Sequence, residues 1–113
     1  MPEIEWGNDL IAALKSAAEN NKLLFIAFAN PDCKMCMKME ESTFSENPVK
    51  EYFSSRFILL KFSSGKNPEK YLRMKVTETP TYIVMNTNGT VLLRLTGYVS
   101  ADDLINKLTN ACS

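Results

Sequence analysis

The sequence predicts a mixed α/β domain in which a sheet of four or five strands is flanked by helices on both faces. The runs "LLFIAFA" and "FILL" are apolar without alternation, which is typical of strands that are covered on both faces. Later in the chain, two strand-like runs are joined by "TNGT", and an Asn-Gly pair is a strong signal for a β-hairpin. Helical segments separate the first two strands, which should therefore be parallel, whereas the hairpin strands should be antiparallel.

The first half of the chain is interpreted as helix, strand, helix and helix, over residues 9–21, 22–29, 34–41 and 45–55. Asn8 can cap the first of these helices, and Leu10 and Leu14 lie on its apolar face. Asn47 can cap the last of them, with Pro48 at the first helical position, where proline is favoured.

The second half continues as strand, helix, strand, strand and helix, over residues 56–62, 66–75, 79–86, 90–99 and 100–112. Asn88 and Gly89 predict a type I′ turn in the hairpin, in which both residues have positive φ. Ser100, with Asp103 three residues later, predicts a capped start for the last helix. The whole chain, residues 1–113, is therefore expected to fold as a single domain.

Composition excludes several functional classes. Lysine plus arginine and aspartate plus glutamate number 13 each, so the net charge is zero and a nucleic-acid-binding surface is not expected. No apolar run approaches the roughly 18 residues that a membrane span needs. The N-terminus lacks the basic and apolar regions of a signal peptide, so we expect a cytoplasmic protein or a mature exported domain. A monomer is expected.

The cysteines are the residues that carry chemistry. Three cysteines do not make a disulfide scaffold, and the odd number leaves at least one thiol unpaired within the chain. The absence of histidine excludes Cys–His nucleophilic catalysis and most zinc sites. Cys112 stands near the C-terminus and is expected to be a spare thiol. Cys33 and Cys36 are separated by two residues and directly follow the first buried strand.

This position favours redox chemistry at the cysteine pair. Cys33 should lie beyond the C-terminal end of a central strand and at the N-terminus of a helix, where backbone N–H groups and the helix dipole favour an anion. We therefore expect a lowered pKa for the Cys33 thiol, an effect to which Lys34 adds and which Asp32 opposes. Cys36, in the first helical turn, can close a small disulfide ring, so the pair can exchange two electrons.

Other interpretations of this segment are open at this point. The two cysteines could be unrelated core residues, since free cysteine packs well in apolar surroundings. Zinc would need four ligands, which this chain does not readily supply. Copper(I) prefers soft sulfur ligands, and "CKMCMKM" offers Cys33 and Cys36 with three methionines. Of these, Met35 and Met39 share a helix face and Met37 points elsewhere, which is more typical of core packing.

The motifs together resemble the thioredoxin superfamily. "DCKMC" after a buried strand, "TETP" before another, and a hairpin followed by a final helix carry the resemblance, which covers residues 6–108. It implies a thioredoxin fold in which Pro80 is cis and faces the cysteine pair, and in which the Thr79 backbone pairs with a bound substrate strand. From the residues alone, a trans proline that opens a strand is an alternative.

Within the superfamily, "CKMCMKMEESTFSENPVKEYF" resembles the thioredoxin-like C-terminal domain of DsbD-type electron transporters and related small exported proteins. The buried acid that the family carries six residues before the first cysteine is replaced here by Ala27. Lys61 matches the lysine that accompanies this acid, and without the acid it should turn toward solvent or toward Glu40. Glu40, four residues after Cys36, is our candidate to replace the acid as the proton acceptor for Cys36, with a solvated surface glutamate as the alternative.

The sequence therefore predicts a thiol–disulfide oxidoreductase in which Cys33 attacks and Cys36 resolves. The resemblance favours a reductase that exchanges electrons with protein disulfides and with a dithiol partner protein, without a bound cofactor or metal. The competing class is a non-catalytic thiol module, either a thioredoxin-like binding domain or a copper(I) carrier that uses the two cysteines and the nearby methionines.

Overall fold

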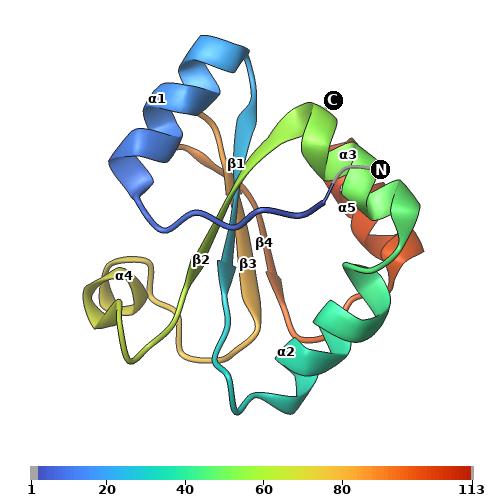
Figure 1. The fold of residues 1–113 in the computed structure, drawn as a ribbon. Helices are drawn as coiled ribbons and strands as arrows, with labels where there is room; N and C mark the ends of the chain where they lie inside the picture. The colour runs from blue at the N-terminus through green and yellow to red at the C-terminus, as the bar shows by residue number, and fades with distance from the viewer. Residues whose placement is uncertain (1–2, 113) are drawn as a thin grey trace.

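In the computed structural model, which describes residues 3–112, a four-stranded sheet runs through the centre of the molecule (Figure 1). The strands lie in the order β2-β1-β3-β4. Their bounds are β1 Leu23–Phe28, β2 Phe57–Phe62, β3 Thr81–Met85 and β4 Val91–Thr96. β1 and β2 are parallel, and β3 is antiparallel to both β1 and β4. The predicted mixed sheet, with its parallel pair and C-terminal hairpin, is confirmed.

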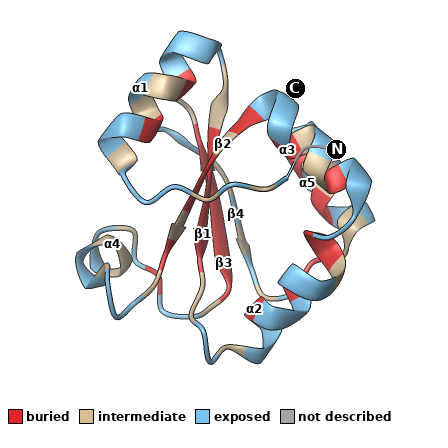
Figure 2. Ribbon diagram, in the orientation of Figure 1, coloured by how far each residue is buried: buried red, intermediate tan, exposed pale blue. Residues whose placement is uncertain are grey.

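Helices cover both faces of the sheet. They are α1 Leu10–Asn20, α2 Lys34–Lys38, the π-helix η1 Met39–Thr43, α3 Asn47–Arg56, α4 Pro68–Arg73 and α5 Ala101–Cys112. Leu24 of β1 packs with Ala17 of α1 on one face, and Phe25 packs with Phe53 of α3 on the other, because successive side chains of a strand alternate. Figure 2 shows the buried residues concentrated on the central strands. Within residues 3–112, no helix is long and apolar enough to span a membrane.

The N-terminal segment crosses the outer edge of β2 without adding a full strand. Gly7 forms one isolated parallel bridge with Leu60. Its N–H donates to the Leu59 carbonyl at 2.8 Å, and its carbonyl accepts from the Lys61 N–H at 2.9 Å. The described residues therefore form the four-stranded version of the predicted sheet, with a single bridge in place of a fifth strand.

The second predicted helix is shorter than expected, because it is α-helical only through α2 and continues as the π-helix η1. The Phe44 N–H donates to the Met39 carbonyl at 2.8 Å, which closes the wider turn. Contacts from the loop before α5 accompany this geometry: Thr43 Oγ1 donates to the Val99 carbonyl at 2.5 Å, and the Val99 N–H donates to Met39 Sδ at 3.3 Å. The π-helix thus coincides with tertiary hydrogen bonds, and local propensity does not predict it.

The hairpin turn also differs from the predicted type I′. Gly89 has a φ of 83°, but Asn88 is not among the residues with positive φ. The Asn86 side chain accepts hydrogen bonds from the N–H groups of Asn88 and Thr90, each at 3.0 Å. The loop is therefore built around the Asn86 side chain, with glycine in the left-handed position.

Two predicted N-caps are displaced by one residue. The carboxylate of Asp9, rather than the Asn8 amide, caps α1 and accepts a hydrogen bond from its first turn at 3.1 Å. α3 begins at Asn47 itself, after Glu46. Neighbouring polar residues have similar preferences for the N-cap position, so the sequence does not distinguish between them. The path of the chain into the helix decides which one becomes the N-cap.

Tyr82 of β3 is buried in the core beside the cysteine-bearing end of the sheet. Its side chain is 2% exposed, and its ring stacks on Phe25 with centroids 5.5 Å apart. Burial raises the pKa of Tyr82, and the negative charge of Glu40 raises it further.

We expect the free energy of unfolding to fall as pH rises above about 10, the ordinary tyrosine pKa, because the unfolded chain then loses the Tyr82 proton while the folded state keeps it. The Tyr82→Phe variant should lose less stability over that range. Urea unfolding at a series of alkaline pH values measures this, with Tyr52→Phe as the matched control. An identical alkaline loss in Tyr82→Phe and the parent would contradict it.

Candidate redox site

Cys33 and Cys36 lie where the chain leaves β1 and enters α2, and they are joined in a disulfide. Cys33 is the N-cap of α2, and its Sγ accepts a hydrogen bond from the Cys36 N–H at 3.2 Å. Cys33 is half-exposed, whereas Cys36 is only 5% exposed. The pair therefore has one accessible and one covered sulfur, at the helix start that the sequence predicts.

Thr79 and Pro80 lie at the same end of the sheet as the cysteines. The Thr79–Pro80 peptide bond is cis, and it leads directly into β3. Thr81 pairs with Phe28, the last residue of β1, so the residues before β3 approach the loop that carries Cys33. Pro80 is buried and its carbonyl accepts from the Gly97 N–H at 2.8 Å, while Thr79 is half-exposed. The turn before β3 is thus fixed in place by the segment after β4.

Lys61 and Glu40 form an ion pair, with Lys61 Nζ 2.6 Å from Glu40 Oε1. Lys61 pairs in register with Ala27, the position where the family places its buried acid. With no acid there, the lysine turns toward Glu40, the second of the two directions expected for it. The Lys61 ammonium also lies over the ring of Trp6, 4.7 Å from its centroid.

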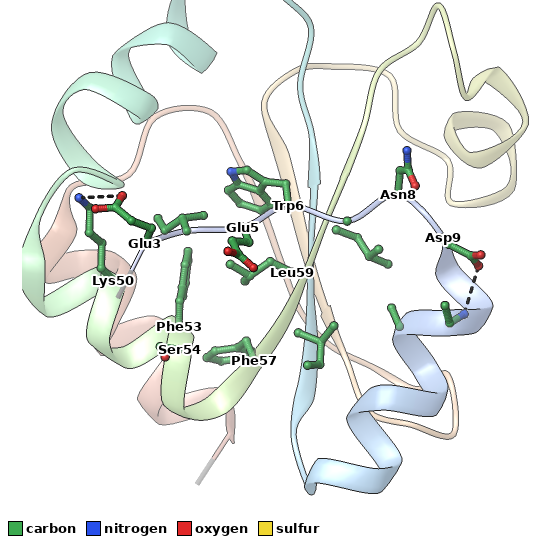
Figure 3. A pocket seen from close by; sticks show the side chains of 16 residues that line it. Glu3, Glu5, Trp6, Asn8, Asp9, Lys50, Phe53, Ser54, Phe57 and Leu59 are labelled. Atoms are coloured by element: carbon green, nitrogen blue, oxygen red, sulfur yellow. Dashed lines mark hydrogen bonds and ion pairs between the residues drawn. The ribbon is translucent and has the colours of Figure 1, made fainter. Parts of the chain in front are cut away.

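Trp6, Glu40 and Lys61 line a cleft of about 510 Å³ that reaches Cys36. The cleft is bounded by the N-terminal segment, the loop after β1, the start of α2, β2 and the loop after β2. Its lining residues are Trp6, Gly7, Asn8, Ala29, Asn30, Pro31, Cys36, Met37, Glu40, Lys61, Ser63, Lys66 and Asn67. A second cleft of about 580 Å³ lies on the other side of the N-terminal segment and contains no cysteine (Figure 3).

The three methionines near the pair have different environments. Met35 and Met37 are exposed, whereas Met39 is fully buried and its sulfur accepts the Val99 N–H. Met39 is therefore a core residue whose sulfur is already engaged and is not available to a metal. Among residues 3–112, no group of three or more Cys, Asp or Glu side chains is arranged to hold a metal ion.

The remaining predicted residues lie at the rim of the pair or far from it. Asp32 and Lys34 are exposed on either side of Cys33 in the chain. Cys112, at the end of α5, is a free and partly buried thiol whose pKa is raised by burial and lowered to a smaller extent by Arg56. It does not line the cleft at Cys36.

Trp6 is the residue that sequence reasoning missed as part of this site. It stands 27 residues before Cys33, in a segment without a motif. Its contact with Lys61 follows from the Gly7 bridge to β2, which is a long-range pairing. The only signal in the sequence is that Trp6 is the single tryptophan of the chain, which does not indicate a location.

A family model described as a thioredoxin-like domain matches residues 10–111. The thiol:disulfide interchange protein DsbD of Campylobacter jejuni (strain RM1221) is 29% identical over 91 residues, which cover 79% of this chain and 16% of that protein. This chain therefore spans less than a fifth of the DsbD relative.

Two further similarities cover nearly all of this chain. Thioredoxin-1 of Drosophila melanogaster is 29% identical over 110 residues, covering 97% of this chain and 92% of that protein. The solution structure of a thioredoxin from Thermus thermophilus superposes with a TM-score of 0.84 at 22% identity, covering 97% of this chain and 88% of that one, which shows the fold.

The fold, the Cys33–Cys36 pair and the relatives together support thiol–disulfide oxidoreductase activity. The resemblance to thioredoxins and to DsbD-type proteins that the motifs indicate is confirmed. The match over residues 10–111 shows that this chain belongs to the family of thioredoxin-like domains.

Proposed function

We propose that this chain is a reductase of protein disulfides in which Cys33 is the attacking thiol and Cys36 the resolving thiol. The observation that carries the proposal is the asymmetry of the pair: Cys33 is half-exposed at the start of α2, and Cys36 is 5% exposed behind it. A substrate sulfur can reach the first cysteine, while the second is buried and accessible only from the cleft that it lines.

The reaction begins from the dithiol form. The Cys33 thiolate attacks one sulfur of a substrate disulfide, which forms a mixed disulfide and releases one substrate thiolate to be protonated. Cys36 then loses its proton and attacks Cys33 Sγ, which releases the second substrate thiolate and forms the Cys33–Cys36 disulfide. Two electrons pass to the substrate, and a dithiol partner protein returns two electrons to the oxidised pair. No bound cofactor takes part, and a monomer suffices.

Thr79 and Pro80 are proposed to position the substrate polypeptide. Thr79 is half-exposed at the cysteine-bearing end of the sheet, where its backbone is proposed to pair with an extended substrate segment. Asp32 and Lys34, exposed on either side of Cys33, are proposed to oppose and to favour its thiolate, respectively.

Glu40, paired with Lys61, is proposed to accept the proton of Cys36. It contributes the single carboxylate among the residues that line the cleft at Cys36. We expect Glu40→Gln to slow the resolving step by up to about 100-fold near neutral pH and to change its pH dependence. Stopped-flow kinetics of mixed-disulfide resolution measure this, with the exposed neighbour Glu41→Gln as control. An unchanged pH dependence in Glu40→Gln rules out this role.

Insulin reduction tests the function itself. With dithiothreitol as the electron source, the wild-type protein should accelerate the reduction and precipitation of insulin, and Cys33→Ser should return the rate to the uncatalysed background. Cys112→Ser, which removes the thiol outside the site, should keep the full rate. Activity that survives in Cys33→Ser, or an inactive wild-type protein, would overturn the proposal.

The direction of electron flow is decided by the reduction potential of the Cys33–Cys36 pair. The resemblance to DsbD-type transporters favours a reductase, so we expect a value nearer to about −270 mV, that of thioredoxin, than to about −120 mV, that of a strong oxidant. Equilibration with glutathione redox buffers measures it. A value near the oxidant's would make the chain an oxidase. The copper(I) alternative gains no support from the geometry, since Met39 is turned into the core.

A further inference from the structure

We propose that Trp6 is a positioning residue of the redox site, which holds the Lys61 ammonium beside Glu40 and thereby sets the pH range in which Cys36 resolves mixed disulfides. This inference rests on the proposed function and adds the N-terminal segment to its machinery. Trp6 itself has no part in bond making. It acts on the cysteine through Lys61, which contacts Trp6 and lines the same cleft as Cys36.

The first link is the side chain of Lys61. Its Nζ lies 4.7 Å from the centroid of the Trp6 ring and 2.6 Å from Glu40 Oε1. The lysine side chain is 33% exposed, so water competes only partly with these two partners. A cation in contact with both an aromatic face and a carboxylate has fewer accessible positions than the same side chain in water.

The second link is the main chain. Gly7, the neighbour of Trp6, accepts a hydrogen bond from the Lys61 N–H at 2.9 Å. It also donates to the Leu59 carbonyl at 2.8 Å, which completes the isolated bridge to β2. Figure 3 shows the segment from Glu3 to Asp9 crossing the strands, with Trp6 projecting from it. The N-terminal segment therefore holds Lys61 at its backbone and at its ammonium group.

The third link is the anchoring of Trp6. Its ring packs against three aromatic rings of the core, with centroid separations of 5.5 Å to Phe44, 6.3 Å to Phe25 and 6.5 Å to Phe53. Phe25, Phe44 and Phe53 are all at least 96% buried. Because these rings are fixed in the core, the face that Trp6 presents to Lys61 is a fixed surface rather than a mobile one.

The last link is the cleft that Trp6 and Lys61 share with Cys36. The charged groups that line it are Glu40, Lys61 and Lys66. Tyr82, a residue of β3, lies buried near Glu40. A positive charge near Cys36 favours its thiolate, which is the form that attacks the mixed disulfide. If Lys61 were free to extend into solvent, this charge would move away and Cys36 would lose its proton only at higher pH.

The test follows the resolving step with a small probe, so that no protein substrate is needed. The reduced protein, in a Cys112→Ser background, is mixed with an aromatic nitrobenzoate disulfide whose leaving thiolate is coloured. Cys33 releases the first coloured thiolate, and the attack of Cys36 on the resulting mixed disulfide releases the second. The rate of the second release, measured against pH, gives a midpoint for the resolving step.

We expect Trp6→Leu to move this midpoint to higher pH and to slow the second release at neutral pH about two- to fivefold, which corresponds to the loss of one exposed cation–π contact. Trp6→Phe, which keeps an aromatic face, should move it less. Lys61→Met should move it in the same direction, and adding Trp6→Leu to Lys61→Met should change nothing further, because the cation through which Trp6 acts is already absent.

The matched control is Tyr52→Leu. Tyr52 packs on the same core and contacts a cation, Arg56, but does not line the cleft, so its loss should leave the midpoint unchanged. If Trp6→Leu does not fold, the midpoints of Trp6→Phe and Lys61→Met are compared with that of the parent protein instead. An unmoved midpoint in the folded Trp6 variants, or additive effects in the double variant, would overturn the inference. A wild-type protein that releases both thiolates but does not reduce insulin would overturn the proposed function alone.

Discussion

Cys36→Ser is expected to leave the protein covalently attached to its substrate instead of turning over. Cys33 remains half-exposed and able to attack, so the mixed disulfide forms as before. A serine hydroxyl does not displace a thiolate from a disulfide, and the residue at position 36 is the one group bonded to Cys33 in the oxidised form. The catalytic cycle should therefore stop at its intermediate.

Non-reducing electrophoresis with reduced Cys36→Ser and an oxidised protein substrate measures this trapping. The expected product is a disulfide-linked conjugate that dithiothreitol cleaves. In the insulin assay, Cys36→Ser should reduce insulin only at the background rate. Cys33→Ser should form no such conjugate, since Cys36 is only 5% exposed and out of reach of a protein substrate. In a Cys112→Ser background, which removes the other free thiol, a conjugate formed equally well by Cys33→Ser would show that Cys36, rather than Cys33, meets the substrate.

Phe25→Ala is expected to cost about 3–5 kcal/mol of the free energy of unfolding, the usual range for a buried phenylalanine. Phe25 lies on the central strand β1 and is fully buried. Its ring contacts those of Trp6, Phe44, Phe53, Phe57 and Tyr82. Domains of this kind have total stabilities of about 5–15 kcal/mol, so this one substitution removes a large share of the total.

Urea unfolding, followed by circular dichroism, measures the loss in Phe25→Ala. Leu72→Ala is the matched control, because Leu72 is 81% exposed on α4 and its truncation should change stability by less than about 0.5 kcal/mol. Equal losses in the two variants would mean that the aromatic cluster around Phe25 contributes no more to stability than an exposed side chain does. Since Trp6 packs on Phe25, the destabilised variant should also loosen the Lys61 contact.

Local sequence determined the order of the strands and main helices and the position of the cysteine pair. The unbroken apolar run of β1 indicated a central strand because a strand that is covered on both faces has no polar side. Cys33 and Cys36 directly follow it, so the end of the strand and the start of α2 place them together. The spacing also allowed the disulfide that the structure shows. These features depend on neighbouring residues, whose relative positions the chain itself constrains.

The arrangement around the pair was decided by tertiary contacts. Lys61 turns to Glu40 and lies over the ring of Trp6, which is brought to it by the Gly7 bridge to β2. The π-helix after α2 likewise accompanies hydrogen bonds to Val99, which lies 60 residues from Met39. Such contacts join residues that are distant in the chain. Their geometry depends on how the sheet and the helices pack, and local sequence patterns do not predict that packing.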